Sequence, residues 1–191
     1  NHNIFLKDIN GNVSPDIIMY NISISNSDPI YCSYNDGKGN FSEVEPLLST
    51  TNLQSLGGLK AYIYDFADVD GDGLNDIFLE KVPHHIYFSG AYEGVGWFKN
   101  LGSNGFSDFK LIYKPTSDLP RTFDYKLVDL DCDGDKDLVC QLWDGIRNGS
   151  VLESNVWKGA GWIRNRGYKF SPFELLFSMD ENMSDIGANH F

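Results

Sequence analysis

The stretch Asp68-Val69-Asp70-Gly71-Asp72-Gly73-Leu74-Asn75-Asp76 decides how this 191-residue chain is organised, because the stretch recurs. A close copy, Asp129-Leu130-Asp131-Cys132-Asp133-Gly134-Asp135-Lys136-Asp137, stands 61 residues later. A weaker copy, Asp8-Ile9-Asn10-Gly11-Asn12-Val13-Ser14-Pro15-Asp16, stands 60 residues earlier. Each copy has oxygen-bearing side chains at positions 1, 3, 5 and 9 of the loop. Self-similarity at a fixed spacing is typical of repeat architectures, so the sequence predicts three units of about 60 residues.

A second motif follows each acidic loop and keeps its phase. Gly96-Trp97-Phe98-Lys99-Asn100-Leu101-Gly102-Ser103-Asn104-Gly105-Phe106 corresponds, with one deletion, to Gly161-Trp162-Ile163-Arg164-Asn165-Arg166-Gly167-Tyr168-Lys169-Phe170. The first unit has Cys32-Ser33-Tyr34-Asn35-Asp36-Gly37-Lys38-Gly39-Asn40-Phe41, which keeps the Asn, Gly and Phe but lacks the Trp. Two motifs in constant order indicate that the whole unit repeats, not the acidic loop alone.

Short apolar runs flank the acidic loops and predict β-strands. They lie at residues 4–6, 17–19, 77–79, 127–128 and 138–139. The Trp motif is expected to form a third strand whose Asn-x-Gly end supplies positive φ for a hairpin, with Phe106 or Phe170 opening the next strand. No long 3.6-residue apolar period is present, so little helix is expected. We therefore expect an all-β chain of four-stranded antiparallel units, the architecture of β-propeller blades, with approximate units 1–60, 61–121 and 122–191 in one propeller segment.

The combined pattern, Asp-x-Asp-x-Asp-Gly-x-x-Asp followed by an aromatic-x-x-Asn-x-Gly segment and a Phe, resembles the FG-GAP/VCBS repeat. That repeat builds the β-propeller of integrin α-subunits and of many secreted adhesins and lectins. The resemblance spans roughly residues 4–177. The first unit departs from it, with Asn10 and Asn12 in place of Asp and Val13 where the turn glycine usually stands.

The resemblance also bears on how the chain is completed. A propeller needs at least about four blades to close its ring, and three units alone would leave open sheet faces at both ends. We therefore expect further propeller blades, supplied by the same precursor, by another chain or by a homodimer with six blades.

The acidic loops are predicted to bind Ca²⁺, which prefers six to eight oxygen ligands. Two sites are expected, with a third that is weaker. Gly73 and Gly134 at position 6 permit the tight turn around the ion. The expected ligands are side-chain oxygens at positions 1, 3, 5 and 9 and the carbonyl at position 7: Asp68, Asp70, Asp72, Leu74 and Asp76; Asp129, Asp131, Asp133, Asp135 and Asp137; and Asp8, Asn10, Asn12, Ser14 and Asp16.

Two alternatives compete with this interpretation. An EF-hand opens with the same residues but requires a bidentate acid at position 12, followed by a helix. Position 12 is Met19, Leu79 or Cys140, and strand-like residues follow, so the EF-hand fails. The other alternative is an acidic turn without metal, because Asp and Gly favour turns anyway.

Composition excludes some classes of protein. The formal net charge is −12, which argues against a nucleic-acid partner, since such binding needs basic patches. No run of 18 apolar residues predicts a membrane span. The opening Asn1-His2-Asn3 suggests a processed N-terminus without a signal peptide. The thiols Cys32, Cys132 and Cys140 are odd in number, and their pairing stays open. Asn-x-Ser sequons at Asn12, Asn21, Asn40, Asn148 and Asn182 favour a glycoprotein mildly.

No catalytic arrangement is expected. The sequence has no nucleophile elbow and no phosphate loop, and the pair His84-His85 lacks a visible third metal ligand. Trp143 and Trp157 are candidates for an aromatic platform that binds a sugar or a protein. The leading hypothesis is a non-catalytic, calcium-stabilised module for adhesion to a protein or glycan, outside the cell or in a lumen. The alternative is an accessory or structural propeller domain of a larger secreted enzyme, toxin or multi-chain assembly.

Overall fold

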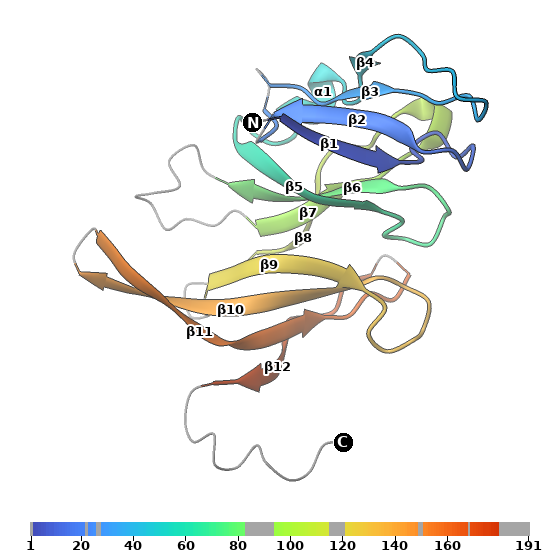
Figure 1. Ribbon diagram of the computed structural model, residues 1–191. Helices are drawn as coiled ribbons and strands as arrows, with labels where there is room; N and C mark the ends of the chain where they lie inside the picture. The colour runs from blue at the N-terminus through green and yellow to red at the C-terminus, as the bar shows by residue number, and fades with distance from the viewer. Residues whose placement is uncertain are drawn as a thin grey trace.

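Three four-stranded antiparallel sheets make up the fold, and within each sheet the strands follow chain order (Figure 1). The computed structural model describes residues 2–21, 23–25, 28–82, 94–114, 121–148, 151–167 and 169–179. The expected all-β class with four-stranded antiparallel units is confirmed. The first sheet contains β1 (His2–Lys7), β2 (Asp16–Asn21), β3 (Tyr31–Ser33) and β4 (Glu45–Pro46); the second contains β5 (Lys60–Ala67), β6 (Asp76–Val82), β7 (Gly94–Phe98) and β8 (Lys110–Tyr113); the third contains β9 (Arg121–Val128), β10 (Asp137–Asn148), β11 (Val151–Ile163) and β12 (Glu174–Ser178).

One short helix, α1 (Thr50–Gln54), lies in the connection between the first and second sheets. Its start is fixed by a capping box, in which Ser49 and Asn52 exchange side-chain hydrogen bonds with each other's main chain. The Asn52 amide also donates to the carbonyls of Phe106 and Ser107, both at 2.8 Å. The connection is therefore tied to the turn that follows β7.

The middle sheet is buried on both faces. On β6, Ile77 and Leu79 join the core shared with the first sheet, whereas Phe78 between them joins the core shared with the third. Side chains alternate across a strand, so an uninterrupted apolar run is what a strand covered on both faces requires. Within the described part of the chain, the first sheet packs against another sheet on one face only. On β1, Ile4 and Leu6 are 67% and 62% exposed, while Phe5 packs into the core.

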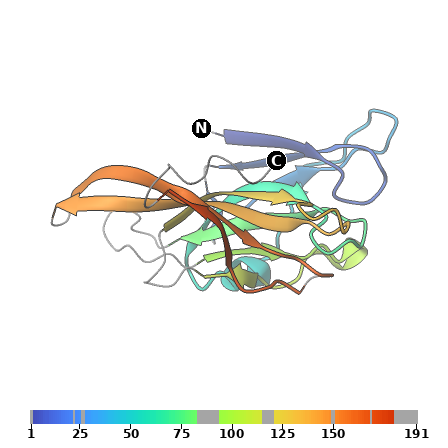
Figure 2. The same cartoon turned by 90° about the horizontal axis from the view of Figure 1, so that it is seen from below.

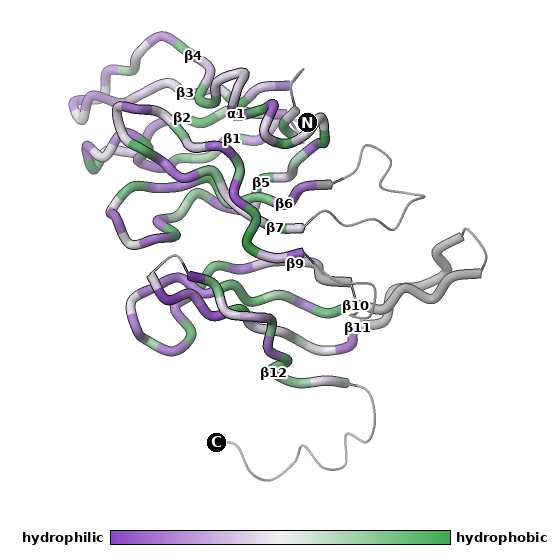
Figure 3. Tube along the Cα trace, turned by 180° about the vertical axis from the view of Figure 1, so that it is seen from behind, coloured by the Kyte–Doolittle hydropathy of each residue, from purple (hydrophilic) through white to green (hydrophobic). Residues whose placement is uncertain are grey.

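The acidic loops all lie along one edge of the three sheets. Each loop connects the first strand of its sheet to the second, namely β1 to β2, β5 to β6 and β9 to β10. Figures 1 and 2 show these connections on the same side of the molecule, and Figure 3 shows them as mainly hydrophilic stretches. The repeat in the sequence is therefore also a repeat in space.

The fourth strand of the second and third units begins later than expected. Phe106 forms only an isolated bridge with Asn100, and β8 and β12 begin at Lys110 and Glu174. A serine after the phenylalanine explains the delay, because its hydroxyl takes the place of a ladder carbonyl. The main-chain N–H groups of Tyr34, Lys99 and Arg164 donate to the hydroxyls of Ser42, Ser107 and Ser171 at 2.9, 3.0 and 3.0 Å.

The glycine before each repeat tryptophan makes room for an aromatic ring. A Cβ atom at Gly96 would lie 2.6 Å from Phe109 Cζ, and one at Gly161 would lie 2.0 Å from Phe173 Cε2. Each ring therefore sits against the backbone of the third strand of its sheet. This close approach explains the Gly-Trp pairs at these positions.

Candidate metal centre

The aspartate at position 9 is the fixed point of every acidic loop. Asp16, Asp76 and Asp137 are each completely buried. One carboxylate oxygen accepts the main-chain N–H at position 2 of the same loop, from Ile9, Val69 or Leu130, at 2.8, 2.9 and 3.0 Å. The other accepts the main-chain N–H of the repeat asparagine, Asn35, Asn100 or Asn165, at 2.8, 2.7 and 2.8 Å. The carboxylate thus joins the loop to the third strand of its own sheet.

The aspartate at position 1 shapes the turn. In the second loop one Asp68 oxygen accepts the N–H of Gly71 at 2.8 Å and the other accepts that of Gly73 at 2.8 Å. Asp8 makes the same contacts with Gly11 and Val13, at 2.8 and 2.7 Å. In the third loop Asp129 accepts from Asp133 and Gly134, both at 3.1 Å. Positions 1 and 9 therefore fix the loop through main-chain contacts in all three copies.

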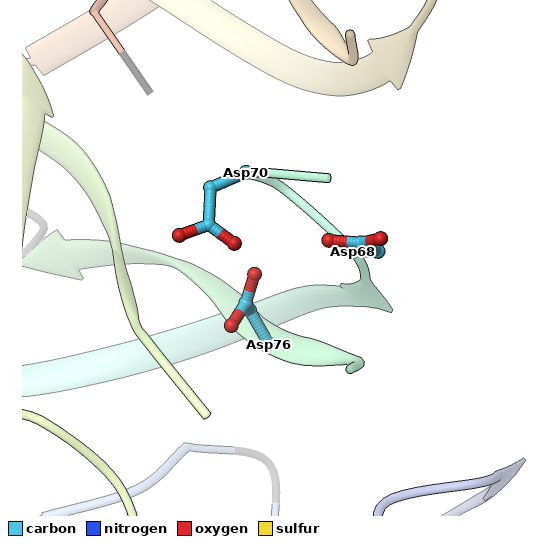
Figure 4. A group of neighbouring side chains, drawn as sticks. All are labelled: Asp68, Asp70 and Asp76. Atoms are coloured by element: carbon cyan, nitrogen blue, oxygen red, sulfur yellow. The ribbon is translucent and has the colours of Figure 1, made fainter. Parts of the chain in front are cut away.

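Two of the loops bring three carboxylates together. Oxygens of Asp68, Asp70 and Asp76 lie within 4.8 Å of one another, and oxygens of Asp129, Asp131 and Asp137 form an equivalent triad. Figure 4 shows the Asp70 and Asp76 carboxylates directed at each other with Asp68 beside them. Ligands on opposite sides of a Ca²⁺ ion with bonds of about 2.3–2.6 Å lie about 5 Å apart, so the triads have the dimensions of such a site.

The chemistry of the second triad also fits a hard cation. The Asp70 side chain is only 5% exposed, and its Oδ1 has no hydrogen-bond partner among the residues that the structure describes. A buried carboxylate oxygen without a partner carries a large desolvation cost. A divalent cation bound by all-oxygen ligands would remove that cost.

Electrostatics show that the second site is strained without a cation. Burial raises the pKa of Asp76 to about 7, aided by the charges of Asp70 and Asp72 and opposed by the hydrogen bonds from Asn100 and Val69. A carboxyl group with such a pKa is only partly ionised near neutrality. A cation among the carboxylates would favour the ionised form and reverse the shift.

Several predicted ligands lie outside the triads. Asp72 accepts the Leu74 N–H at 3.0 Å and pairs with Lys99, and Asp133 accepts the Asp135 N–H at 3.0 Å. The side chain of Asp135 accepts the N–H of Gly167. Coordination by Asp72, by Asp133 and by the carbonyls of Leu74 and Asp135 stays a prediction.

The first loop keeps the shape of the others with a different set of side chains. The amide oxygens of Asn10 and Asn12 accept the N–H groups of Asn12 and Ser14, at 3.1 and 2.9 Å. Asp8 and Asp16 are its two carboxylates. The weaker site predicted at Asp8, Asn10, Asn12, Ser14 and Asp16 therefore has fewer charges to offer a cation.

The sequence reasoning missed a basic residue beside each triad. Lys99 Nζ contacts Asp70 and lies 2.8 Å from Asp72 Oδ2. At the same repeat position Arg164 Nε lies 3.4 Å from Asp131 Oδ2, and its guanidinium stacks over the Trp162 ring at 4.3 Å. A signal was present, because a basic residue precedes the repeat asparagine in both units.

The sequence pattern also did not predict the second role of the repeat asparagine, which is to link neighbouring acidic loops. The Asn100 amide donates to the Asn75 carbonyl in its own loop, at 3.0 Å, and to the Ile9 carbonyl in the preceding loop, at 2.8 Å. Asn165 repeats this with Lys136 in its own loop and Val69 in the preceding one, at 3.1 and 2.7 Å. Each asparagine therefore links its own acidic loop to the one before it.

Two loop positions with positive φ carry a residue other than glycine. Position 6 has positive φ in every loop, at Val13 (68°), Gly73 (88°) and Gly134 (97°). Position 4 also has positive φ, and in the third loop it is Cys132 (60°). Val13 and Cys132 therefore adopt a conformation that favours glycine.

The other candidate residues are only partly placed. Trp157 is 38% exposed, and its ring meets that of Phe177 edge-on at 5.8 Å. The β10–β11 register pairs the backbone of Trp143 with that of Trp157, but the Trp143 side chain lies outside the described residues, as do His84 and His85. Cys32, Cys132 and Cys140 are all free thiols, and burial raises the pKa of both Cys32 and Cys140 to about 12. Over the described ranges, no helix has the length and apolar character needed to cross a membrane.

These features define a class of protein: a repeat protein of four-stranded antiparallel sheets, each with a framed acidic loop at the same edge. Residues 8–79 match the family model described as an FG-GAP-like repeat, so this part of the chain is an FG-GAP-like repeat. The match begins at the first aspartate of the first loop and ends in β6, three residues after Asp76. Curated proteins give no match to the chain.

Proposed function

We propose that this chain is a calcium-stabilised segment of an extracellular β-propeller that binds a protein or glycan and carries out no catalysis. The observation that supports it most is the pair of carboxylate triads, each held by a buried position-9 aspartate in the same hydrogen-bond framework. Crowded carboxylates repel one another unless a cation lies among them. Calcium would then fix the loop edge of each sheet rather than act as a signal.

An extracellular setting follows from the expected affinity. Extracellular calcium modules typically bind in the range of about 10⁻⁴–10⁻³ M, and an open hairpin loop with three clustered carboxylates suits that range. The exposed sequon residues Asn21 and Asn40 are compatible with glycosylation. Trp157 beside Phe177 offers an apolar surface for a ligand, with Trp143 as its backbone neighbour.

Thermal unfolding with and without calcium tests the metal. We expect the melting temperature to fall when EDTA replaces 1 mM Ca²⁺, and to recover with Ca²⁺ but not with Mg²⁺, which demands stricter octahedral geometry. Asp131→Asn should lose part of the calcium effect while keeping the shape of its side chain. An identical melting temperature in EDTA and Ca²⁺ would refute the metal role. A glycan array then separates a lectin from a protein-binding module.

The outer face of the first sheet favours a further unit of this same repeat as the partner. Ile4 pairs with Met19 and Leu6 with Ile17 across β1 and β2, so the four side chains share the face that points away from the second sheet. Both faces of the middle sheet are covered by such a unit. In the third loop, Leu130 occupies the position of Ile9 and Val69. The carbonyls of Ile9 and Val69 each accept a hydrogen bond from the repeat asparagine of the following unit.

Native mass spectrometry separates the two sources of that unit. A six-bladed dimer at micromolar concentration would identify a second copy as the partner. A strict monomer would refute self-association and favour blades from a longer precursor, as in an accessory or structural propeller domain of a larger secreted enzyme, toxin or assembly. Leu6→Asp, on the exposed face, should abolish the dimer and leave the fold intact.

A further inference from the structure

The ammonium of Lys99 lies against carboxylates that a divalent cation would also bind. Lys99 directly follows β7, and its ammonium contacts one oxygen of Asp70 and lies 2.8 Å from Asp72 Oδ2. These two contacts hold the ammonium against the carboxylates of the second loop.

The two carboxylate oxygens of Asp70 have different surroundings. Asp70 Oδ2 contacts Lys99, while Asp70 Oδ1 is buried, lacks a hydrogen-bond partner and belongs to the side chain that forms the triad with Asp68 and Asp76. Two cations within a few ångströms of each other repel strongly in a partly buried site. The loop pattern predicts that a divalent ion also binds Asp72. Asp72 Oδ1 accepts the Leu74 N–H, so the ion would bind Asp72 Oδ2, the oxygen that Lys99 contacts.

We infer that Lys99 is a built-in counterion of the second loop, which neutralises the loop in the absence of calcium and is displaced when calcium binds. This inference rests on the proposed calcium role. The lysine side chain suits such an exchange, because its flexible four-carbon stem can carry the ammonium to solvent. Lys99 is already 23% exposed, so the route outward is short.

The third loop is the internal comparison. Among the described residues, Arg164 forms an ion pair only with Asp131, at 3.4 Å, its Nε makes no hydrogen bond, and its guanidinium stacks on Trp162. The third triad is thus less fully neutralised than the second. Calcium should fill the third loop first and the second loop at higher concentration, because only the second must release a tightly held ammonium.

Calcium titration calorimetry of the whole chain, after removal of metal with EDTA, tests the exchange. Asp131→Asn removes one carboxylate of the third triad and should weaken that loop, so that the second loop gives most of the binding signal. In that background Lys99→Met should raise the calcium affinity about 10- to 100-fold, the range of a hydrogen bond between charged groups. Lys99→Gln, which keeps donors but lacks the charge, should behave similarly and serves if the methionine variant folds poorly. Lys99→Arg should retain the parental affinity.

A second measurement needs no calcium. In EDTA, Lys99→Met should lower the melting temperature, since Asp70 and Asp72 lose their counterion, whereas Arg164→Met should lower it less. Equal calcium affinities in the parent and Lys99→Met, or an unchanged melting temperature in EDTA, would overturn the inference while leaving the calcium role intact. Absence of calcium binding in every variant would refute the proposed function itself and the exchange with it.

Discussion

We expect the free energy of unfolding to fall with rising pH in the absence of calcium and to rise with pH in its presence, because of the buried Asp76. Burial raises the pKa of this carboxyl from 3.8 to about 7 in the folded chain. A folded state that binds its proton more tightly than the unfolded state is stabilised at low pH. That stability is complete below about pH 4 and is lost as the pH rises through about 7.

The magnitude follows from the two pKa values. A shift from 3.8 to about 7 corresponds to about 4 kcal/mol, because each pH unit between them contributes about 1.4 kcal/mol. Without metal, therefore, the free energy of unfolding should fall by a few kcal/mol between pH 4.5 and pH 7.5. Under the proposed calcium role, the ionised Asp76 is expected to be a ligand, so that calcium binding strengthens over the same interval. Calcium at a hundredfold excess over its dissociation constant adds about 2.7 kcal/mol.

Urea unfolding at several pH values, in EDTA and in calcium, measures both slopes. Asp76→Asn is the matched control, since it cannot titrate, and subtracting its pH profile removes the contribution of every other group. Asp72 does not mimic the effect, because its pKa is lowered and its contribution is lost only at acid pH. A difference profile in EDTA that is flat, or that rises from pH 4.5 to 7.5, would refute the burial argument.

Four further substitutions test the framework of the repeat. Asn100→Ala should lower the free energy of unfolding by about 2–4 kcal/mol, since the buried Ile9 carbonyl and the part-buried Asn75 carbonyl lose their donor, whereas the exposed Asn104→Ala should change it by less than about 0.5 kcal/mol in the same urea titration. Val13→Gly and Cys132→Gly should each raise stability by about 1 kcal/mol, because both residues have positive φ; unchanged or lower melting temperatures would show that the turn carries no strain. Gly161→Ala should cost about 1–3 kcal/mol by pushing Phe173 off the third strand, and a wild-type melting temperature would contradict that packing.

The repeat, the strand class and the loop positions could all be predicted from the sequence, because each depends on a local pattern. The nine-residue loop is closed by residues within it, and the strands around it are marked by runs such as Ile77-Phe78-Leu79. That run also carried tertiary information, since a strand covered on both faces needs apolar side chains on both.

What could not be predicted depends on partners distant in the chain. Lys99 and Asp70 are 29 residues apart, and Asn165 and the Val69 carbonyl are 96 apart. Neither contact is implied by residue type, since an asparagine before a turn is explained by turn chemistry alone. The serine that delays β8 could not be predicted for a different reason: Ser107 acts through its hydroxyl on the main chain of the nearby Lys99, and a strand pattern reflects only the alternation of side chains.

The three loops together distinguish the residues that shape the turn from those that only change its charge. All three copies have aspartate at positions 1 and 9, and those six carboxylates make the main-chain contacts that fix the loop. Positions 3 and 5 vary: they are Asn10 and Asn12 in the first loop and aspartates in the others. The asparagines keep the local contacts of the turn, since the Asn12 amide oxygen accepts from Ser14 as the Asp72 carboxylate accepts from Leu74. They give up negative charge and leave the loop folded. The shape of the edge is thus set by positions 1 and 9, and the charge offered to a cation is set independently by positions 3 and 5. This independence lets one chain carry loops of different charge on a single unchanged framework, and we expect their affinities for a cation to differ accordingly.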